Sequence, residues 1–197
     1  MDDVITAYSS EVDYIMLSEE EGTTATYRSV VEAADSSSAE QLTPKAGETY
    51  TLGDATWQIL SCDTDMPDLN ESSIVIKLTY GNTSFLFTGD ATMNTEQGLE
   101  MSGYDLKSDV LKVGHHGSAG STADSFLDAV APEIAVISVD SESDMGEMYH
   151  HPATSTLQRL SQHGIKVYRT DELGTIRITS DGEKLAVSAF ATSTDGT

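Results

Sequence analysis

The sequence predicts a mixed α/β fold, a layered sandwich of helices and antiparallel hairpins. Residues 73–80 and 85–87 are two apolar runs on either side of Gly81-Asn82, which is a hairpin signal. The apolar residues 27, 30, 31 and 34 recur at helical spacing. Residues 134–139 form a short apolar run typical of a buried strand. We expect these helices and strands to pack in layers, because each must bury its apolar face against another element.

The first half of the chain is predicted to alternate helices with short strands. Residues 2–8 resemble the last turns of a helix that has no cap before it. Thr23 or Thr24 can cap the next helix, which ends at Ser36–Ser38. Gly53-Asp54 joins two strands, and a polar loop follows them. The expected elements are strand 12–17, a helix from residue 23, strands 49–52 and 56–60, loop 62–69, the hairpin 73–87 and helix 95–101.

The second half is predicted to continue as strand, helix and hairpin. We expect Ser121-Thr122 to cap a helix that ends before Pro132, and Pro152 to lie in the first turn of a helix that stops at Gly164. The other expected elements are strand 110–113, strand 134–139, the polar loop 140–148, strand 167–169 and a hairpin that turns at Asp181-Gly182. Residues 1–190 are expected to form one domain, with 191–197 as a frayed tail.

Composition limits the possible functions. The 197 residues are enough for one domain with a sizeable core. Lys and Arg number 10 against 33 Asp and Glu, so the formal charge of −23 disfavours free binding to DNA or membranes unless a metal reverses it locally. Cys62 is the single cysteine, which excludes an intrachain disulfide. No apolar run of ~18 residues and no signal-peptide pattern is present.

Metal-binding residue types follow two predicted strands. Asp90 comes after 85–87 behind a glycine, and His115-His116 come after 110–113 behind another. His150-His151 form a second pair, whereas His163 beside a helix-ending glycine receives no role. A single loop histidine is usually an ordinary surface residue. Two pairs together with Gly89-Asp90 predict a metal site at the edge of the sheet.

The expected chemistry is that of a metallohydrolase. Zinc and manganese take neutral imidazoles and carboxylates, and a carboxylate such as Asp90 can bridge two ions. Ser118, Ser121 and Thr122 are compatible with a phosphate cradle, although an ordinary helix cap explains the last two as well. Lys112 has the simpler interpretation of a solvated strand residue. The sequence contains no Gly-x-Ser-x-Gly elbow and no Walker-type phosphate loop.

Several motifs occur in an order that identifies a family by resemblance. They are Leu69-Asn-Glu-Ser-Ser-Ile-Val-Ile-Lys-Leu-Thr-Tyr-Gly81, Phe85-Leu-Phe-Thr-Gly-Asp90, Val110-Leu-Lys-Val-Gly-His-His-Gly-Ser118, Tyr149-His-His-Pro152 and Tyr168-Arg-Thr-Asp-Glu-Leu-Gly174. The chain resembles the metallo-β-lactamase-fold hydrolase domain of the ComEC-type DNA-uptake competence proteins. The resemblance implies an αββα sandwich and a metal-dependent phosphodiesterase. Its expected substrate is single-stranded DNA or another phosphodiester, and the intact site holds two Zn or Mn ions.

The resemblance also assigns roles to individual residues. Asp90 matches the bridging aspartate, and His115-His116 match the late histidine motif, so these three are the expected catalytic and metal-binding residues. Ser118, His151 and Asn70 are the expected substrate-binding residues. His150 stands where glycine is usual, and Asn70 where the wider superfamily places a ligand histidine.

One family motif is absent from the sequence. The ligand motif His-x-His-x-Asp-His does not occur, and residues 2–8 resemble the helix that follows it in relatives. We therefore expect an N-terminally truncated domain, its C-terminal two-thirds, that is inactive alone, binds at most one ion weakly, and associates with the missing segment or with itself. The alternative is a non-catalytic binding or structural module. The location stays open between the extracytoplasmic face of a bacterial membrane and secretion.

Overall fold

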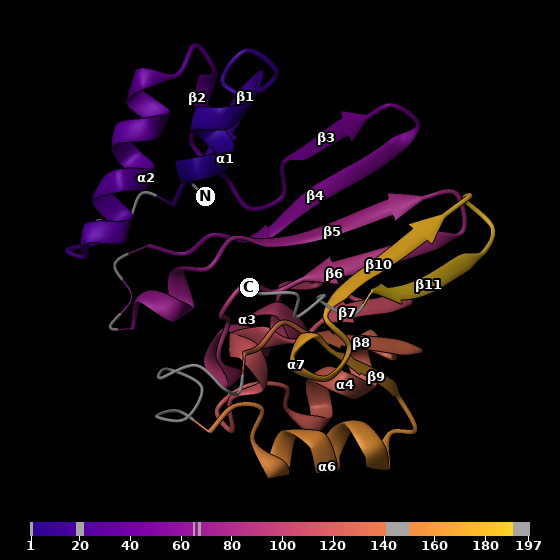
Figure 1. The fold of residues 1–197 in the computed structure, drawn as a ribbon. Coiled ribbons are helices and arrows are strands. Elements are labelled where there is room, and N and C mark those ends of the chain that lie inside the picture. Colours follow the sequence, from indigo (N-terminus) through magenta and orange to yellow (C-terminus); the bar gives the residue numbers. More distant parts are fainter. Residues whose placement is uncertain (1, 19–21, 65, 67, 141–149, 191–197) are drawn as a thin grey trace, which may run out of the picture.

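The computed structural model describes residues 2–18, 22–64, 66, 68–140 and 150–190 (Figure 1). Its centre is a seven-stranded sheet in the order β3-β4-β5-β6-β7-β8-β9. The pairing is antiparallel from β3 to β6 and parallel from β6 to β9. The strands are Thr49–Leu52 (β3), Ala55–Ser61 (β4), Val75–Tyr80 (β5), Thr83–Phe87 (β6), Val110–Lys112 (β7), Ile134–Ile137 (β8) and Lys166–Arg169 (β9).

The N-terminal elements pack around a small cluster of their own. Strands β1 (Tyr14–Met16) and β2 (Glu40–Leu42) form a parallel pair beside helices α1 (Asp2–Ala7) and α2 (Ala25–Ser36). Ile5, Ile15 and Ala34 are buried there. The hydroxyl of Thr24 accepts a hydrogen bond from the Tyr27 amide at 3.1 Å, so the predicted cap of α2 is confirmed.

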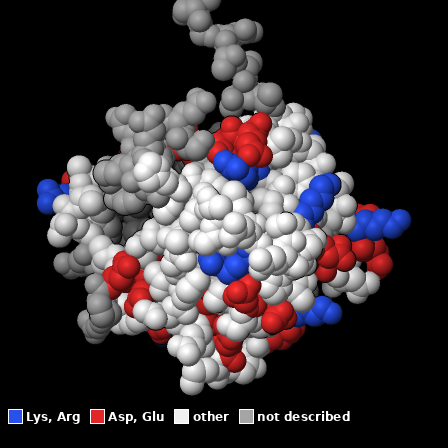
Figure 2. Space-filling view, turned by 90° about the horizontal axis from the view of Figure 1, so that it is seen from below, with Lys and Arg blue, Asp and Glu red and all other residues white. Residues whose placement is uncertain are grey.

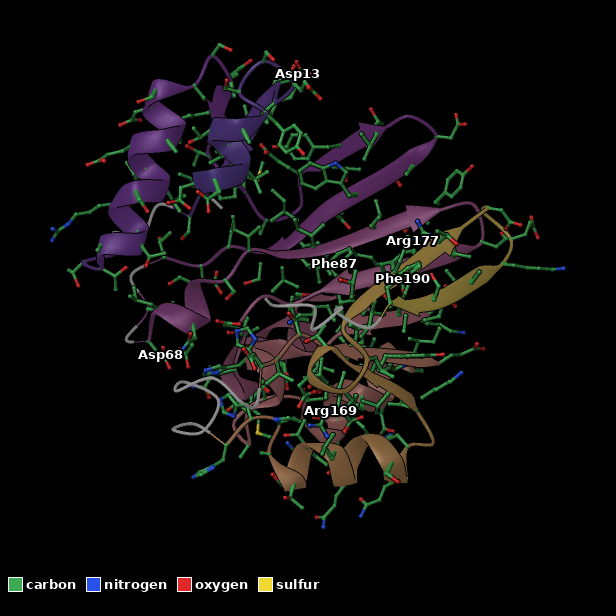
Figure 3. All side chains as sticks on the ribbon, in the orientation of Figure 1. Asp13, Asp68, Phe87, Arg169, Arg177 and Phe190 are labelled. Carbon is green, nitrogen blue, oxygen red and sulfur yellow. The ribbon has the colours of Figure 1, made fainter. Side chains whose placement is uncertain are left out.

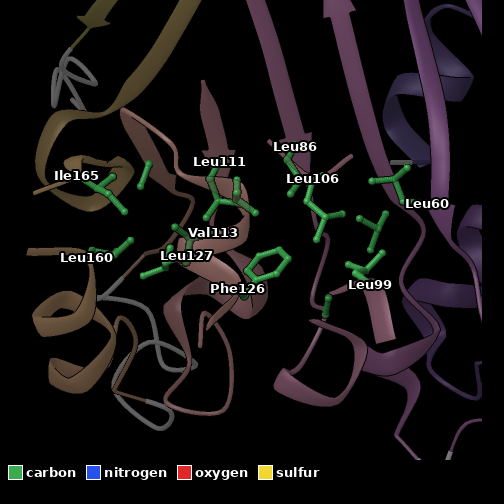
Figure 4. Close-up of a cluster of buried hydrophobic side chains, with 14 of the residues drawn as sticks. Leu60, Leu86, Leu99, Leu106, Leu111, Val113, Phe126, Leu127, Leu160 and Ile165 are labelled. Atoms are coloured by element: carbon green, nitrogen blue, oxygen red, sulfur yellow. The ribbon is translucent and has the colours of Figure 1, made fainter. Parts of the chain in front are cut away.

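One face of the main sheet is covered by helices. Helices α3 (Met93–Ser102), α4 (Asp124–Val130) and α6 (Thr154–Gln162) lie against it (Figure 1). Leu86, Leu111 and Ala135 are register partners on β6, β7 and β8, and each is fully buried. Side chains of parallel partners share a face, so these residues meet Phe126 and Leu160 from the helices in the main core (Figure 4). Hydrophobic burial on this face holds the strand ends in place.

The opposite face carries a second, smaller β layer. Strands β10 (Thr175–Ser180) and β11 (Leu185–Phe190) form an antiparallel hairpin that crosses the main sheet (Figure 1). A cavity of about 240 Å³ lies between the two layers and is lined by Phe85, Phe87, Val110, Val136, Ile176 and Ile178 among others. Phe87 and Phe190 stay 42% and 48% exposed, and Arg177 lies 5.1 Å from the ring centre of Phe190 (Figure 3).

Most predicted elements are confirmed. The turn of the central hairpin pairs Tyr80 with Thr83, and the last hairpin turns after Ser180 as expected. Strand β2 and the short helices η1 (Leu69–Ser72), η2 (Gly114–Gly117) and α7 (Thr170–Leu173) were not predicted. The tail 191–197 and, apart from Asp140, the loop 140–148 lie outside the described residues. Within the described part of the chain no helix has the length and apolarity to cross a membrane.

Two predicted helix starts are wrong. Helix α4 begins at Asp124 after Ala123, which has no side-chain cap, so Ser121 and Thr122 do not cap it. The Ser121 hydroxyl donates to the Gly114 carbonyl instead, within the preceding loop. Helix α6 begins at Thr154, so Pro152 lies before the first turn and not within it.

Candidate metal centre

Asp90 stands in a tight turn after β6. Gly89 has φ of 55°, and a Cβ there would lie 2.9 Å from the Ser73 side chain, so the position favours glycine. The Asp90 amide donates to Ser73 Oγ at 3.0 Å, and the Thr88 hydroxyl donates to the Lys112 carbonyl at 2.8 Å. These bonds fix the half-buried carboxylate at the carboxyl end of the strand.

The histidine pair stands in the next turn along the sheet, η2 (Gly114–Gly117). His115 and His116 have φ of 47° and 53°, both in the left-handed region that non-glycine residues rarely adopt. The His115 amide donates to the Gly89 carbonyl at 3.2 Å, which ties this turn to the Asp90 turn. A Cβ on Gly114 would lie 2.8 Å from the Ala91 carbonyl oxygen, so this glycine permits the two turns to touch.

His116 and Asp90 face one another. His116 Nε2 lies 3.4 Å from Asp90 Oδ1, and His116 Nδ1 lies 2.6 Å from the Ser138 carbonyl oxygen. A carbonyl only accepts, so Nδ1 carries a proton, and Nε2 is the ring nitrogen that faces the Asp90 carboxylate. Without a proton on Nε2, both Nε2 and Asp90 Oδ1 are acceptors and repel each other at 3.4 Å. Either a proton on Nε2 or a metal ion between the two atoms would remove this repulsion. The bond to a backbone carbonyl is also the usual support of a ligand histidine.

His151 completes the group from the other side. Its ring centre lies 5.6 Å from that of His115, with the rings edge to face. The Ala153 amide donates to the Gly117 carbonyl at 2.8 Å, and a Cβ on Gly117 would lie 2.7 Å from Pro152 Cβ, so the His151 segment packs directly on the histidine turn. Burial lowers the pKa of His151, and His115 and His116 lower it further against the opposing effect of Asp90. The imidazole is therefore kept in the neutral form that binds metals.

Lys112 differs from its predicted solvated position. Its side chain is half-buried on the hairpin side of the sheet, and Nζ donates to the Val113 carbonyl at 2.9 Å. Burial lowers the pKa of Lys112, while the Asp90 carboxylate opposes that change. The interpretation as a solvated strand residue is wrong, because Lys112 alternates with a core residue and lies under the β10–β11 hairpin.

The predicted substrate-binding residues are less closely grouped. Asn70 is the second residue of the short helix η1, and its side-chain Nδ2 donates to Asp68 Oδ1 at 2.9 Å (Asp68 is labelled in Figure 3). Ser118 Oγ accepts from the Gly120 amide at 3.2 Å. The roles of Asn70, Ser118 and His151 toward substrate stay predictions.

The phosphate cradle that the sequence suggested around residues 121 and 122 is not available. Ser121 Oγ donates to the Gly114 carbonyl at 2.9 Å, and the Thr122 and Ala123 amides donate to Glu96 at 2.5 and 2.8 Å. A buried side chain from α3 therefore takes the place that a phosphate would occupy. Sequence reasoning missed Glu96 because an acidic residue on a helix resembles the solvated acids that dominate this chain.

The donor set fits a transition metal in kind but falls short in number. Imidazoles and a carboxylate converge at the carboxyl ends of β6 and β7, the edge of a parallel sheet at which ligands usually bind. Within the described residues, however, no three His, Cys, Asp or Glu side chains stand close enough together to hold an ion. Asp90 and His116 are the two nearest candidate ligands, with His115 and His151 beside them.

Two known proteins are similar in sequence to this chain. The chain is 39% identical over 134 residues to ComE operon protein 3 of Bacillus subtilis, covering 68% of the chain and 17% of that protein. It is 40% identical over 111 residues to competence protein ComA of Neisseria gonorrhoeae, covering 56% of the chain and 16% of that protein. The chain thus spans about a sixth of the length of these relatives.

The fold is also similar to that of a solved structure. CmlA, a diiron β-hydroxylase from Streptomyces venezuelae, superposes with a TM-score of 0.51 and 16% identity over 82% of this chain and 39% of that one. This likeness bears on the fold alone. The family model of the metallo-beta-lactamase superfamily matches residues 3–141. The predicted fold class and the predicted family are therefore confirmed, and the chain belongs to the metallo-beta-lactamase superfamily.

Proposed function

We propose that the chain is part of a ComEC-like, metal-dependent hydrolase that acts on phosphodiesters, with DNA as the substrate. The observation that carries the proposal is the opposition of His116 Nε2 and Asp90 Oδ1 at 3.4 Å, with His116 Nδ1 bound to a backbone carbonyl. Superfamily membership and the similarity to ComE operon protein 3 and to competence protein ComA support the same class of function.

The residues of the candidate site would have separate roles in metal binding and in substrate binding. Asp90, His115 and His116 would hold zinc or manganese, and His151 would stand at the rim with Ser118 toward the substrate. A bound ion would supply Lewis acidity, to activate water and to neutralise negative charge on a phosphodiester. Lys112, kept near Asp90 by its bond to the Val113 carbonyl, adds positive charge close to the site.

The charge of the protein makes the ion necessary for an anionic substrate. Acidic residues outnumber basic ones by 33 to 10, and they form several separate groups on the face shown in Figure 2. Such a surface repels DNA over distances of about a Debye length, roughly 8 Å at physiological salt. Binding of DNA is therefore expected to need the metal, and to weaken when a chelator removes it.

The 197 residues supply only part of a two-ion ligand set, because His-x-His-x-Asp-His does not occur in them. We propose that the remaining ligands come from a segment that carries this motif, and that the chain alone binds at most one ion and is inactive. A location at the extracytoplasmic face of a bacterial membrane belongs to the same proposal.

Calorimetry with Zn²⁺ and with Mn²⁺ tests the metal site. We expect at most one weak site on the chain, abolished in Asp90→Ala and in His116→Ala. Asp128→Ala is the matched control, because it removes an exposed carboxylate of α4 away from the site. Unchanged binding in Asp90→Ala would place the site elsewhere, and two tight sites would contradict the proposed ligand count.

Complementation tests the hydrolase itself. A segment of a competence relative that carries His-x-His-x-Asp-His is added to the chain, and hydrolysis of bis(p-nitrophenyl) phosphate is followed with Mn²⁺. We expect turnover with both parts together, none with either alone, and none when the chain carries His116→Ala. Turnover that survives His116→Ala would contradict the assignment.

A second candidate function is a non-catalytic binding or structural module. The absence of a three-residue ligand set among the described residues favours it. Calorimetry separates the two candidates. Metal binding that is lost in Asp90→Ala but kept in Asp128→Ala supports the metal-dependent hydrolase, whereas a non-catalytic module is not expected to bind metal through Asp90.

A further inference from the structure

We infer that Glu96 and Arg159 are positioning residues that hold the loop 114–123 in the conformation that presents His115 and His116. The contacts stand on the structure alone, whereas their consequence for metal binding rests on the proposed function. The two side chains come from α3 and α6, which lie on the helix-covered face of the sheet.

The loop is strained at both ends. His115 and His116 are left-handed at its start, and Thr122 has φ of 63° near its end. A β-branched residue at positive φ is a genuine outlier, and such a conformation persists only when its surroundings enforce it. The contacts of Thr122 therefore show what enforces it here.

Glu96 holds the amide side of Thr122. The side chain is 1% exposed, and its two carboxylate oxygens accept from the Thr122 amide at 2.5 Å and from the Ala123 amide at 2.8 Å. Burial raises the pKa of Glu96, while the two amides and the charge of Arg159 lower it. Hydrogen bonds from two backbone amides to a buried carboxylate are strong and directional.

Arg159 holds the carbonyl side of the same residue. Its Nε donates to the Thr122 carbonyl at 2.7 Å, and one terminal nitrogen donates to the Ser121 carbonyl at 2.8 Å and to Thr156 Oγ1 at 3.0 Å. Thr156 Oγ1 in turn donates to the Ser118 carbonyl at 2.8 Å. Both backbone groups of Thr122 are thus held by opposite charges, which compensate each other across the loop.

A hydrogen bond within the loop connects the segment held by Glu96 and Arg159 to the two histidines. Ser121 Oγ donates to the Gly114 carbonyl at 2.9 Å, which links the braced end of the loop to the residue before His115. Removing the support of a ligand side chain typically weakens metal binding about 10- to 100-fold. Glu96 and Arg159 lie outside the set of ligands, so the expected effect on metal arises through backbone conformation alone.

NMR of the metal-free chain tests the brace directly. Backbone ¹³C shifts of His115, His116 and Thr122 report φ and ψ, and they are compared between the wild type, Glu96→Gln and Arg159→Lys. Gln places an amide NH₂ where a carboxylate oxygen accepts, and Lys replaces the planar fork with a single nitrogen. We expect both variants to move these shifts away from left-handed values and to weaken Zn²⁺ binding about 10- to 100-fold.

Two controls separate positioning from stability and charge. Ile59→Val trims a fully buried side chain of β4, and Glu133→Gln removes an exposed carboxylate, so neither should move the three shifts. Should Glu96→Gln fail to fold, Glu96→Asp keeps the charge but shortens its reach by one methylene. Wild-type shifts of His115, His116 and Thr122 in both brace variants would overturn the inference. Absence of Zn²⁺ binding by the wild type, with the shifts moved as expected, would instead count against the proposed function alone.

Discussion

The two faces of the seven-stranded sheet both carry apolar side chains, but they differ in what covers them. On the helix-covered face, Leu86 and Leu111 are fully buried. On the hairpin-covered face, Phe87 remains 42% exposed, beside a cavity of about 240 Å³ under β10. We infer from this difference in burial that the helix-covered face holds the strands more tightly than the hairpin-covered face does. The strand ends that carry Asp90 and His115 are fixed from that side, through α3, α4 and α6.

The largest effect is expected from truncation on the helix-covered face. Leu111→Ala should lower the free energy of unfolding by about 2–5 kcal/mol, because it leaves a cavity among packed helices. Phe87→Ala removes more atoms but should cost less, since its ring is partly in water already. Urea denaturation of both variants measures the difference. An equal or larger loss for Phe87→Ala would contradict the contrast between the faces.

A second effect is expected in solution behaviour. Exposed aromatic side chains on one sheet face favour association, so the chain should form dimers or larger species in light scattering despite its charge of −23. Phe87→Ser combined with Phe190→Ser should shift the distribution toward monomer. Leu52→Ser, which removes an exposed leucine of β3, serves as the control. A wild type that stays a compact monomer would refute this expectation.

The smallest effect is expected from the Lys77–Asp105 ion pair, which lies where the helix-covered face of the sheet meets solvent. Lys77 pairs in register with Leu86, and Lys77 Nζ lies 2.8 Å from Asp105 Oδ2. The bond from Lys77 holds the pKa of Asp105 below its usual value. The Asp105 side chain is 81% exposed, so screening limits its contribution to a fraction of about 1 kcal/mol.

The sign of its pH dependence follows from the lowered pKa. Stabilisation by Asp105 is present above the unfolded pKa, near 3.8, and is lost as the pH falls through the lower folded value. Lys77→Met should therefore cost a little stability in urea denaturation at pH 7, and less in acid below the folded pKa. A cost that grows on acidification would contradict the pairing.

The sequence predicted what depends on local pattern. The hairpin around Gly81-Asn82 and the strands joined at Gly53-Asp54 appear as expected, because turn residues and alternating apolar residues are local signals. Asp90 and His115-His116 were assigned to strand ends for the same reason, and the structure places them in adjacent turns.

Features that depend on distant contacts could not be predicted. Nothing in the sequence marks Glu96 as different from exposed acids, yet its carboxylate meets two amides 26 and 27 residues later. The hydroxyls of residues 121 and 122 resembled a helix cap because that pattern is local, whereas tertiary contacts of Arg159 and Glu96 decide the conformation. Likewise, no local sequence pattern predicts that the Ser138 carbonyl, just after β8, accepts a hydrogen bond from His116 Nδ1.

Paramagnetic mapping by NMR tests whether a metal centre forms at the strand ends. Substoichiometric Mn²⁺ is added to isotope-labelled chain, and the broadening of each backbone amide is recorded. We expect the amides of Asp90, His116 and His151 to broaden first, and this effect to be lost in Asp90→Ala. Broadening that instead follows exposed acidic residues such as Asp124 and Asp128, unchanged by Asp90→Ala, would show that Mn²⁺ responds only to the charge of −23 and that no metal centre forms at the strand ends.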